Sequence, residues 1–189
     1  MSKQPVGILL AAGLSQRFGS NKLLHSIFDH TPILMVSAKK LVSALPGSVV
    51  VINKSLKNYT IELEQLGLRV VINEHTEKGM GSSIACGIRL CSDASGWLIA
   101  LADMPYIRTE TFTLLVNKIN ETVGIVAPHY EGQRGHPVGF HYRFKHELLA
   151  LSDDVGAREI IKQHHEQLEL LPTDDRGVIQ DVDYKEDLG

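Results

Sequence analysis

The chain has 189 residues, of which 43% are hydrophobic, so it can bury one substantial core. Its 19 Lys and Arg residues and 22 Asp and Glu residues give a formal net charge of −3, which does not supply the positive field that nucleic acid backbones require. Residues 1–6 do not form a targeting signal and no apolar run reaches the roughly 20 residues of a membrane span, so we expect one cytoplasmic domain over residues 1–189, without nucleic acid or membrane partners.

Strand-like and helix-like segments alternate from the N-terminus. Short apolar runs predict buried parallel strands at residues 8–11, 49–52, 68–72, 97–102 and 124–127. Between these runs we expect a helix capped by Thr31 with Pro32 as its first residue, a helix from Leu56 that ends at Gly67, and helices that begin at Ser82 and Thr109. This order is typical of a single-domain, Rossmann-like α/β fold with a mostly parallel sheet and helices on both faces.

The pattern changes after Pro128. Glu131 and Gly132 predict a turn, residues 136–141 an antiparallel excursion, and residues 142–151 and 156–165 two helices. We therefore expect a C-terminal antiparallel elaboration of the sheet that faces the substrate. Cys86 and Cys91 have neither redox nor zinc spacing, which indicates reduced packing residues, and the histidines, including a solvated pair at residues 164–165, do not form a zinc pattern.

The most informative segment is residues 7–24, GILLAAGLSQRFGSNKLL, in which a buried strand enters a glycine loop. Gly13 and Gly19 let the backbone pass close to a ligand, while Arg17 and Lys22 offer positive charge for phosphate oxygens. The loop has neither the G-x-x-x-x-G-K-[ST] nor the G-x-G-x-x-G pattern, so the two commonest phosphate loops are excluded. The residues alone also allow an ordinary strand, turn and helix with solvated cations.

The same loop resembles the L-A-A-G-x-S-x-R-[MF]-G-x-x-K signature of nucleotidyltransferases that make molybdenum cofactor dinucleotides, the cytidylyltransferase branch of the MobA-like NTP transferase family. The resemblance implies nucleotide contacts from the first part of the loop and charge neutralisation from its two cations, Arg17 at the leaving pyrophosphate and Lys22 at the α-phosphoryl group. The nucleotide-binding residues implied here are Leu10, Ala11, Ala12, Gly13 and Ser15. Guanylyl-transferring relatives carry a glycine pair at the Ala11-Ala12 position, so the alanines imply CTP as donor.

Asp103 follows a predicted buried strand and precedes Met104-Pro105, which places a carboxylate at the carboxyl end of that strand. Magnesium needs only one or two carboxylates beside a triphosphate, although an aspartate here could also cap the following turn. Asp-Met-Pro resembles the second signature of the family, which implies that Asp103 coordinates magnesium. The segment 181–188, with Asp183, resembles the family's acidic ending and implies a second metal ligand, although such a run is commonly a solvated face.

Three further segments resemble the family. In residues 77–83 the resemblance implies base and ribose contacts, and the residues themselves equally allow Ser82 to cap a helix; the implied contacts are Gly79, Gly81, Ser82 and Ser83. The segments 133–138 and 154–158 resemble the R-G-H-P-V and G-D-x-G-A-R elements of the cytidylyltransferase branch, although Asp153 stands at the position of the first glycine and His136 could be purely structural. They imply an acceptor site made of Arg134, His136, Asp154 and Arg158.

The resemblance therefore implies Mg-dependent transfer of CMP from CTP to the terminal phosphate of molybdopterin, with residues from about 1 to 128 binding the nucleotide and those from about 129 to 189 the acceptor. The product would pass to a receiving molybdoenzyme. Two alternatives remain open. A nucleotidyltransferase that uses GTP, or that acts on a sugar phosphate or another small phosphorylated acceptor, would use the same loop and Asp103. A non-catalytic chaperone that binds the molybdenum cofactor would not need Lys22 and Asp103.

Overall fold

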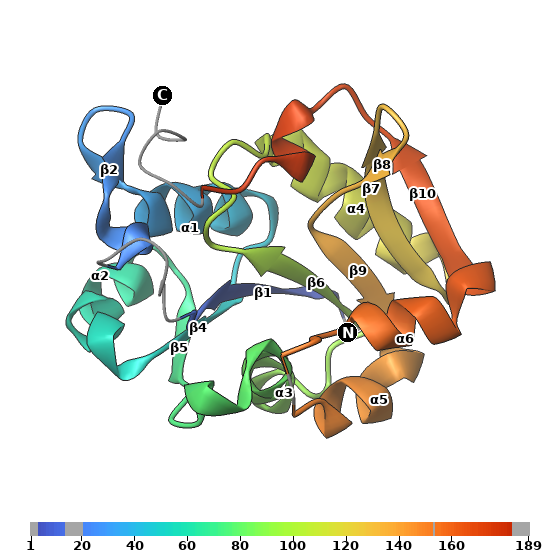
Figure 1. Ribbon diagram of the computed structural model, residues 1–189, viewed down its shortest axis with the longest axis horizontal. Coiled ribbons are helices and arrows are strands. Elements are labelled where there is room, and N and C mark those ends of the chain that lie inside the picture. The colour runs from blue at the N-terminus through green and yellow to red at the C-terminus, as the bar shows by residue number, and fades with distance from the viewer. Residues whose placement is uncertain (1–3, 14–20, 153, 183–189) are drawn as a thin grey trace.

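The computed structural model describes residues 4–13, 21–152 and 154–182, and its centre is one mixed sheet (Figure 1). The order of strands across the sheet is β10-β7-β9-β6-β1-β4-β5, with β8 added to β7. These strands are β1 (Val6–Ala11), β4 (Val49–Ile52), β5 (Arg69–Ile72), β6 (Gly96–Leu101), β7 (Ile125–Tyr130), β8 (Gln133–Arg134), β9 (Val138–His141) and β10 (Leu168–Pro172). The predicted mostly parallel α/β fold is confirmed.

Helices cover both faces of this sheet (Figure 1). They are α1 (Ile33–Ala44), α2 (Thr60–Gln65), α3 (Met80–Leu90), α4 (Thr109–Glu121), α5 (Lys145–Ala150) and α6 (Arg158–Gln163), with 3-10 turns η1 (Lys22–Leu24), η2 (Lys54–Tyr59), η3 (Thr76–Lys78), η4 (Tyr142–Phe144), η5 (His165–Gln167) and η6 (Arg176–Ile179). Residues of α1, α2 and α4 build one buried cluster, and residues of α3, α5 and α6 build another. No helix of the described ranges is long and apolar enough to cross a membrane.

The antiparallel excursion after Pro128 is part of the main sheet. β9 lies between β6 and β7 and pairs antiparallel with both, while Glu131 and Gly132 turn the chain with positive φ angles of 45° and 86°. The predicted turn and antiparallel segment are thus confirmed. Because β9 is central, the segment after Pro128 and the parallel strands β1, β4 and β5 share one sheet.

Three local expectations need correction, and one strand was not predicted. Thr31 does not cap α1: together with Pro32 it forms β3 (Thr31–Pro32), which pairs with β2 (Ser26–Ile27), and the helix begins at Ile33. The helix expected from Ser82 begins earlier, at Met80. The parallel edge strand β10 was not predicted, because its sequence LELLP mixes apolar and charged residues and ends in proline. His165 is exposed as expected, but His164 is only 25% exposed, because its ring packs against Phe144 and its Nε2 lies 2.9 Å from Glu147 Oε2.

The two cysteines behave as packing residues. Cys86 lies within α3, Cys91 ends it, and both thiols are free. Burial raises the pKa of both thiols, that of Cys91 to about 11, so neither is a thiolate near neutral pH.

Candidate active site

The candidate site lies where parallel strands end. β1 pairs with both β4 and β6, and β4 pairs with β5, all in parallel, so their carboxyl ends meet at one edge of the sheet. Ala12 follows β1, Asn53 follows β4, Asn73 follows β5 and Asp103 lies just beyond β6. Ligands of open α/β sheets bind outside this edge, so the structure brings these polar groups to the expected place.

Lys22 and Asp103 form an ion pair at this edge. Lys22 Nζ lies 2.8 Å from Asp103 Oδ2, and the two side chains are only 14% and 23% exposed. The residue before Asp103 is fixed from two sides, because the Ala102 N–H donates to the Leu10 carbonyl at 3.0 Å and the Ala102 carbonyl accepts from Ser37 Oγ at 2.8 Å. The carboxylate is therefore held firmly beside the strand β1.

Asp103 fits the ligand set of a hard cation in part. One carboxylate at a strand end can supply one oxygen to magnesium, which completes its shell with water and phosphate oxygens. The Val182 N–H donates to the Asp103 carbonyl at 2.9 Å, which brings the chain just before Asp183 to Asp103. Asp183 itself lies outside the described residues, and within the described ranges three or more His, Cys, Asp or Glu residues do not gather as a metal site.

The first loop is described only at its two ends. Ser15 and Arg17 lie outside the described residues. Leu10 is 9% exposed, and Ala11 and Ala12 are 1% and 4% exposed and belong to the two different core clusters. The methyl groups of the two alanines are thus packed inside the protein, and a ligand at this edge would meet their backbone.

The second loop joins β5 to α3. Gly79 has a φ of +82°, which favours glycine, and precedes the first residue of the helix. Ser82 does not cap this helix: its Oγ lies 2.8 Å from the Gly79 carbonyl and 3.0 Å from the His75 carbonyl. Asn73 Nδ2 donates to the hydroxyls of Ser82 and Ser83 at 2.9 and 3.0 Å. Gly81 and Ser83 are buried, so the predicted contact residues of this loop are mostly engaged with the protein.

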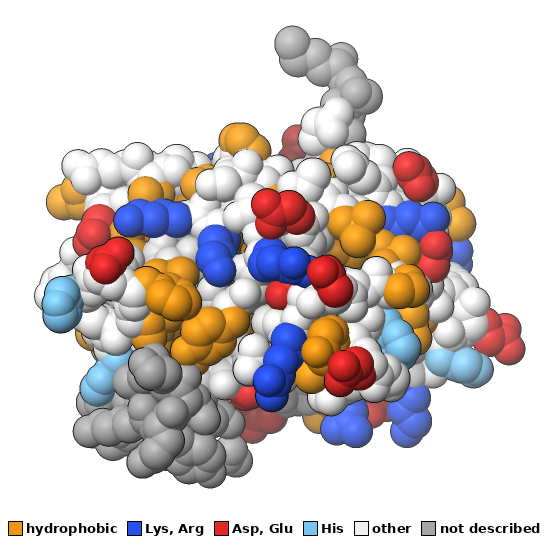
Figure 2. Space-filling view, turned by 90° about the horizontal axis from the view of Figure 1, so that it is seen from above, with side chains coloured by type: hydrophobic (Ala, Val, Ile, Leu, Met, Phe, Trp, Pro, Cys, Tyr) orange, Lys and Arg blue, Asp and Glu red, His pale blue; other side chains and the backbone are white. Residues whose placement is uncertain are grey.

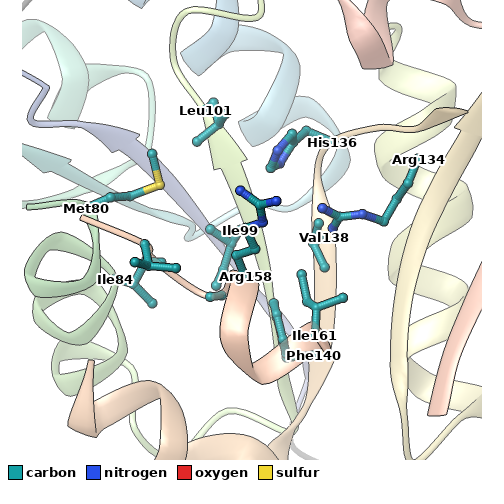
Figure 3. Close-up of a pocket in the computed structure, with 12 residues that line it drawn as sticks. Met80, Ile84, Ile99, Leu101, Arg134, His136, Val138, Phe140, Arg158 and Ile161 are labelled. Carbon is teal, nitrogen blue, oxygen red and sulfur yellow. The ribbon is translucent and has the colours of Figure 1, made fainter. Parts of the chain in front are cut away.

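A cavity of about 210 Å³ opens beside this edge (Figure 3). Its wall is mainly apolar, and the guanidinium groups of Arg134 and Arg158 and the ring of His136 point into it from the side opposite Met80 and Ile84. The other lining residues are Ile99, Leu101, Val138, Phe140, Val155, Ala157 and Ile161. Asp154 is exposed and does not line the cavity, in contrast to the other residues of the predicted acceptor site.

The polar end of this cavity is positively charged. Burial and the neighbouring charge of Arg158 lower the pKa of the Arg134 guanidinium. Burial, followed by the charge of Arg134, lowers the pKa of His136, against an opposing effect of Asp103, so the ring is neutral near pH 7 and lies within electrostatic reach of Asp103. Arg134 Nη1 and His136 Nδ1 are buried without a hydrogen-bond partner among the described residues. Two cationic groups with an unused buried donor suit an anionic ligand.

The glycine between these two residues has a steric role. A Cβ atom on Gly135 would lie 2.5 Å from the Val178 carbonyl oxygen, which also accepts the His136 N–H at 2.8 Å. Only glycine lets the chain approach η6 this closely, and this contact fixes the backbone that presents Arg134 and His136.

Comparison with known proteins agrees with this geometry. The model of the MobA-like NTP transferase domain matches residues 7–168. The chain belongs to this family. It is 30% identical to the probable molybdenum cofactor guanylyltransferase of Bacillus cereus (strain Q1), covering 77% of this chain and 72% of that protein. This membership confirms the resemblance seen in the sequence, and the chain is a nucleotidyltransferase.

Other relatives cover nearly the whole chain. The purine catabolism protein PucB of Bacillus subtilis (strain 168) and the nicotine blue oxidoreductase of Paenarthrobacter nicotinovorans are each 27% identical over 96% of this chain and 93% of their own lengths. The structure of Rv0371c from Mycobacterium tuberculosis H37Rv superposes with a TM-score of 0.87 at 25% identity, covering 99% of this chain and 96% of that one. Rv0371c is also known as a complex with manganese, which superposes with a TM-score of 0.80 at 23% identity over 97% and 95% of the two chains.

Sequence reasoning missed the polar residues that hold the two loops of the candidate site in place. Asn53 and Asn73 are only 6% and 5% exposed, and each donates side-chain hydrogen bonds to one of the two loops. The available signal was their position, one residue beyond each of two predicted apolar strands. Ser37 was missed because its bond to Ala102 joins segments that are far apart in the sequence.

The surface agrees with the charge balance of the sequence. On the face seen in Figure 2, Lys and Arg side chains alternate with Asp and Glu side chains and do not form a basic stripe. Positive charge that is separate from carboxylates occurs inside the cavity, at Arg134 and Arg158. This distribution favours a small anionic ligand over a nucleic acid backbone.

Proposed function

We propose that the chain transfers CMP from CTP to the terminal phosphate of molybdopterin or its molybdenum form, in the cytoplasm, and releases pyrophosphate. The observation that carries this proposal is the Lys22–Asp103 pair at the carboxyl edge of the sheet, beside a cavity lined by Arg134 and Arg158. One place thus combines groups for a metal-bound triphosphate with groups for a second phosphate. A transfer between two phosphorylated substrates requires both.

In the proposed reaction an oxygen of the acceptor phosphate attacks the α-phosphorus of the nucleotide. A new P–O bond forms, the bond from the α-phosphorus to the bridging oxygen breaks, and the electron pair leaves with pyrophosphate. The attacking phosphate is already ionised, so the protein has to position the two substrates and neutralise charge more than remove a proton.

Residues at the β1 and β6 ends would serve the nucleotide. Lys22 would donate to the α-phosphoryl oxygens, and Arg17 would neutralise the leaving pyrophosphate. Asp103, with Asp183, would hold a divalent cation, magnesium in our proposal, which supplies positive charge to the triphosphate when it is bound. The backbone of residues 10–13, together with Ser15 and the loop of residues 79–83, would surround the nucleoside.

The cavity would serve the acceptor. Arg134 and Arg158 would bind its phosphate through charged hydrogen bonds, and the neutral ring of His136 would hydrogen-bond to the same phosphate through the buried Nδ1. The apolar wall favours an acceptor with a flat ring system over a sugar phosphate, because hydroxyl groups placed against Ile99, Val138 and Phe140 would lose their hydrogen bonds to water. Asp154 would act, if at all, from outside the cavity.

The choice of CTP has support only from the sequence. The segments of residues 134–138 and 154–158 and the Ala11-Ala12 pair resemble the cytidylyltransferase branch, whereas the Bacillus cereus relative is named as a guanylyltransferase. GTP is therefore the alternative donor. A non-catalytic chaperone is disfavoured because a carrier protein has no use for Lys22 and Asp103 side by side.

The test is pyrophosphate release by the purified chain with CTP, GTP, ATP or UTP, each with and without molybdopterin and with magnesium or manganese. We expect metal-dependent release that needs molybdopterin and is fastest with CTP. If pyrophosphate release requires a sugar phosphate, the acceptor is a sugar phosphate and not molybdopterin. If release is faster with GTP than with CTP, the donor is GTP. Tight molybdopterin binding without turnover of any nucleotide would favour the chaperone.

A further inference from the structure

The two ends of the first loop are held by one short segment outside it. Asn53 follows the apolar strand β4 and is the N-cap of η2, and Ser55 lies two residues later. Asn53 Nδ2 lies 3.3 Å from the carbonyl oxygens of Ala12 and of Gly13, where the loop begins. The same segment therefore contacts the strand that carries the loop.

Ser55 makes the contact to the other end of the loop. Asn21 Nδ2 donates to Ser55 Oγ at 3.3 Å, and Ser55 Oγ donates to Asn53 Oδ1 at 2.6 Å. Asn21 also accepts the Leu23 N–H at 3.2 Å and thereby caps η1, the turn that begins with Lys22. A continuous chain of side-chain hydrogen bonds thus joins the start of the loop to the residue before Lys22.

The amide of Asn53 has no capacity left for a ligand. Its two N–H groups point to the carbonyls of Ala12 and Gly13, and its oxygen accepts from the Ser55 N–H at 2.9 Å and from Ser55 Oγ. An asparagine offers two donors and two lone pairs, so all four are used within the protein. A buried amide satisfied in this way keeps a fixed orientation, because turning it would separate its donors and its acceptor from their partners.

We propose that Asn53 and Ser55 are positioning residues for nucleotidyl transfer: they join Gly13 to Asn21 and so set the place of Lys22 against the α-phosphoryl group. They do not contact the substrate. This inference rests on the proposed function, because it gives the loop a nucleotide to hold. It adds two residues that the loop sequence does not contain.

The contact to Ala12 also orients the loop backbone. In a trans peptide the carbonyl and the N–H point in opposite directions, so a bond from Asn53 to the Ala12 oxygen turns the N–H of Gly13 away from β4. Backbone N–H groups that are fixed in this manner can donate to phosphate oxygens. Asn53 would therefore set both a backbone donor and, through Ser55 and Asn21, the lysine.

The decisive variants are Asn53→Asp and Ser55→Ala, measured by nucleotide-dependent pyrophosphate release. Aspartate keeps the acceptor for Ser55 but removes both donors to the loop, and we expect kcat to fall about 10- to 100-fold, as for a small misplacement of a catalytic group. Ser55 is exposed, so Ser55→Ala leaves the core intact, and we expect a fall of roughly three- to tenfold. Ser55→Thr retains the hydroxyl and should restore the rate.

Two controls separate positioning from folding. Ser48→Ala removes a buried hydroxyl bond to the Leu45 carbonyl just before β4, at the other end of the strand, and should leave kcat unchanged. In a double-mutant cycle, Ser55→Ala should cost less than about twofold once Lys22→Ala is present, because Ser55 acts through Asn21 on the lysine, and that lysine has gone. A full, multiplicative loss in that background, or a loss of kcat that follows only the melting temperature, would overturn the proposal.

The same variants also distinguish this inference from the proposed reaction. If the wild-type chain turns over no nucleotide with any acceptor, the reaction is wrong, and binding of CTP or GTP with magnesium is measured by calorimetry. Affinity at least threefold weaker in Asn53→Asp then supports the role of Asn53 at the nucleotide. Unchanged affinity, or a wild-type chain that binds neither nucleotide, overturns it.

Discussion

Lys22 Nζ and Asp103 Oδ2 lie 2.8 Å apart, so the cation and the anion that the proposed reaction needs are already paired before any substrate arrives. Both side chains are largely buried, and each charge at the sheet edge has a partner of opposite charge. A triphosphate with its metal would offer each group a new partner of opposite charge, a phosphate oxygen for the lysine and the metal for the aspartate. Each group would then keep a partner of opposite charge on binding, which limits the desolvation cost.

The first prediction concerns the carboxylate. Asp103→Asn keeps the size of the side chain but removes its charge, so we expect turnover to fall by at least about 100-fold and the dependence on metal concentration to shift upward. Pyrophosphate release is measured against magnesium and manganese concentration. Glu64→Gln on the exposed face of α2 is the matched control. If the metal dependence is unchanged in Asp103→Asn, Asp103 does not bind the metal.

The second prediction concerns the lysine. Lys22→Ala should lower kcat about 100- to 1000-fold while the KM for CTP changes by only a few fold, because negative charge on the phosphoryl oxygens is greatest in the transition state. Steady-state kinetics separate the two constants. Lys57→Ala, an exposed lysine of η2, is the control. A rise in KM with an unchanged kcat would make Lys22 a binding residue only.

The third prediction concerns the cationic end of the cavity. Arg134→Gln should raise the KM for the acceptor about 10- to 100-fold and leave the KM for CTP unchanged, because it removes one charged donor from the acceptor phosphate. Its melting temperature should stay the same or rise, because burial and Arg158 both disfavour the charge of Arg134. The exposed Arg89→Gln serves as control. A changed KM for CTP instead would move Arg134 to the nucleotide side.

Sequence reasoning located the strands but not the contacts between distant segments. Residues 49–52 are uniformly apolar, which predicts a strand buried on both faces, and the structure has β4 at those residues. Thr31 and Pro32 carry an N-cap pattern, yet pairing with β2 draws them into a strand, since tertiary pairing overrides a local preference. The Lys22–Asp103 pair and the hydrogen bonds of Asn53 join residues that are far apart in the sequence and meet only when the sheet has formed. A local sequence pattern therefore could not predict these contacts.

The fourth prediction is a pH dependence of stability. Burial lowers the pKa of His136 below the ordinary value of 6.5, so near neutral pH the ring is neutral in the folded chain, and the unfolded chain takes up the proton first as pH falls. The stabilising contribution is complete above about pH 6.5 and is lost as pH falls through the lower, folded-state pKa. Burial acts in the same direction on His141, so both histidines contribute to the wild-type profile.

We therefore expect His136→Asn to lose less stability than the wild type between pH 7.5 and pH 5.5. The difference between the two profiles isolates His136, because His141 and the carboxylates are common to both chains. Chemical denaturation at several pH values gives the free energy of unfolding directly. Parallel profiles would mean that His136 is protonated equally in the folded and unfolded chains.

The last prediction concerns the base. The resemblance takes the Ala11-Ala12 pair as a sign of CTP, and direct selection by these residues would require their methyl groups to crowd a purine. Both side chains lie inside the core, 1% and 4% exposed. Replacing both by glycine should therefore cost about 2–4 kcal/mol of stability, through lost burial and a more flexible backbone, and leave the ratio of kcat/KM for GTP and CTP unchanged. Ala127→Gly, at a fully buried position of β7, is the matched control for stability. If the ratio instead shifts toward GTP by on the order of 1–3 kcal/mol, the alanines do select the base, whereas an unchanged ratio leaves that role to the loop of residues 79–83.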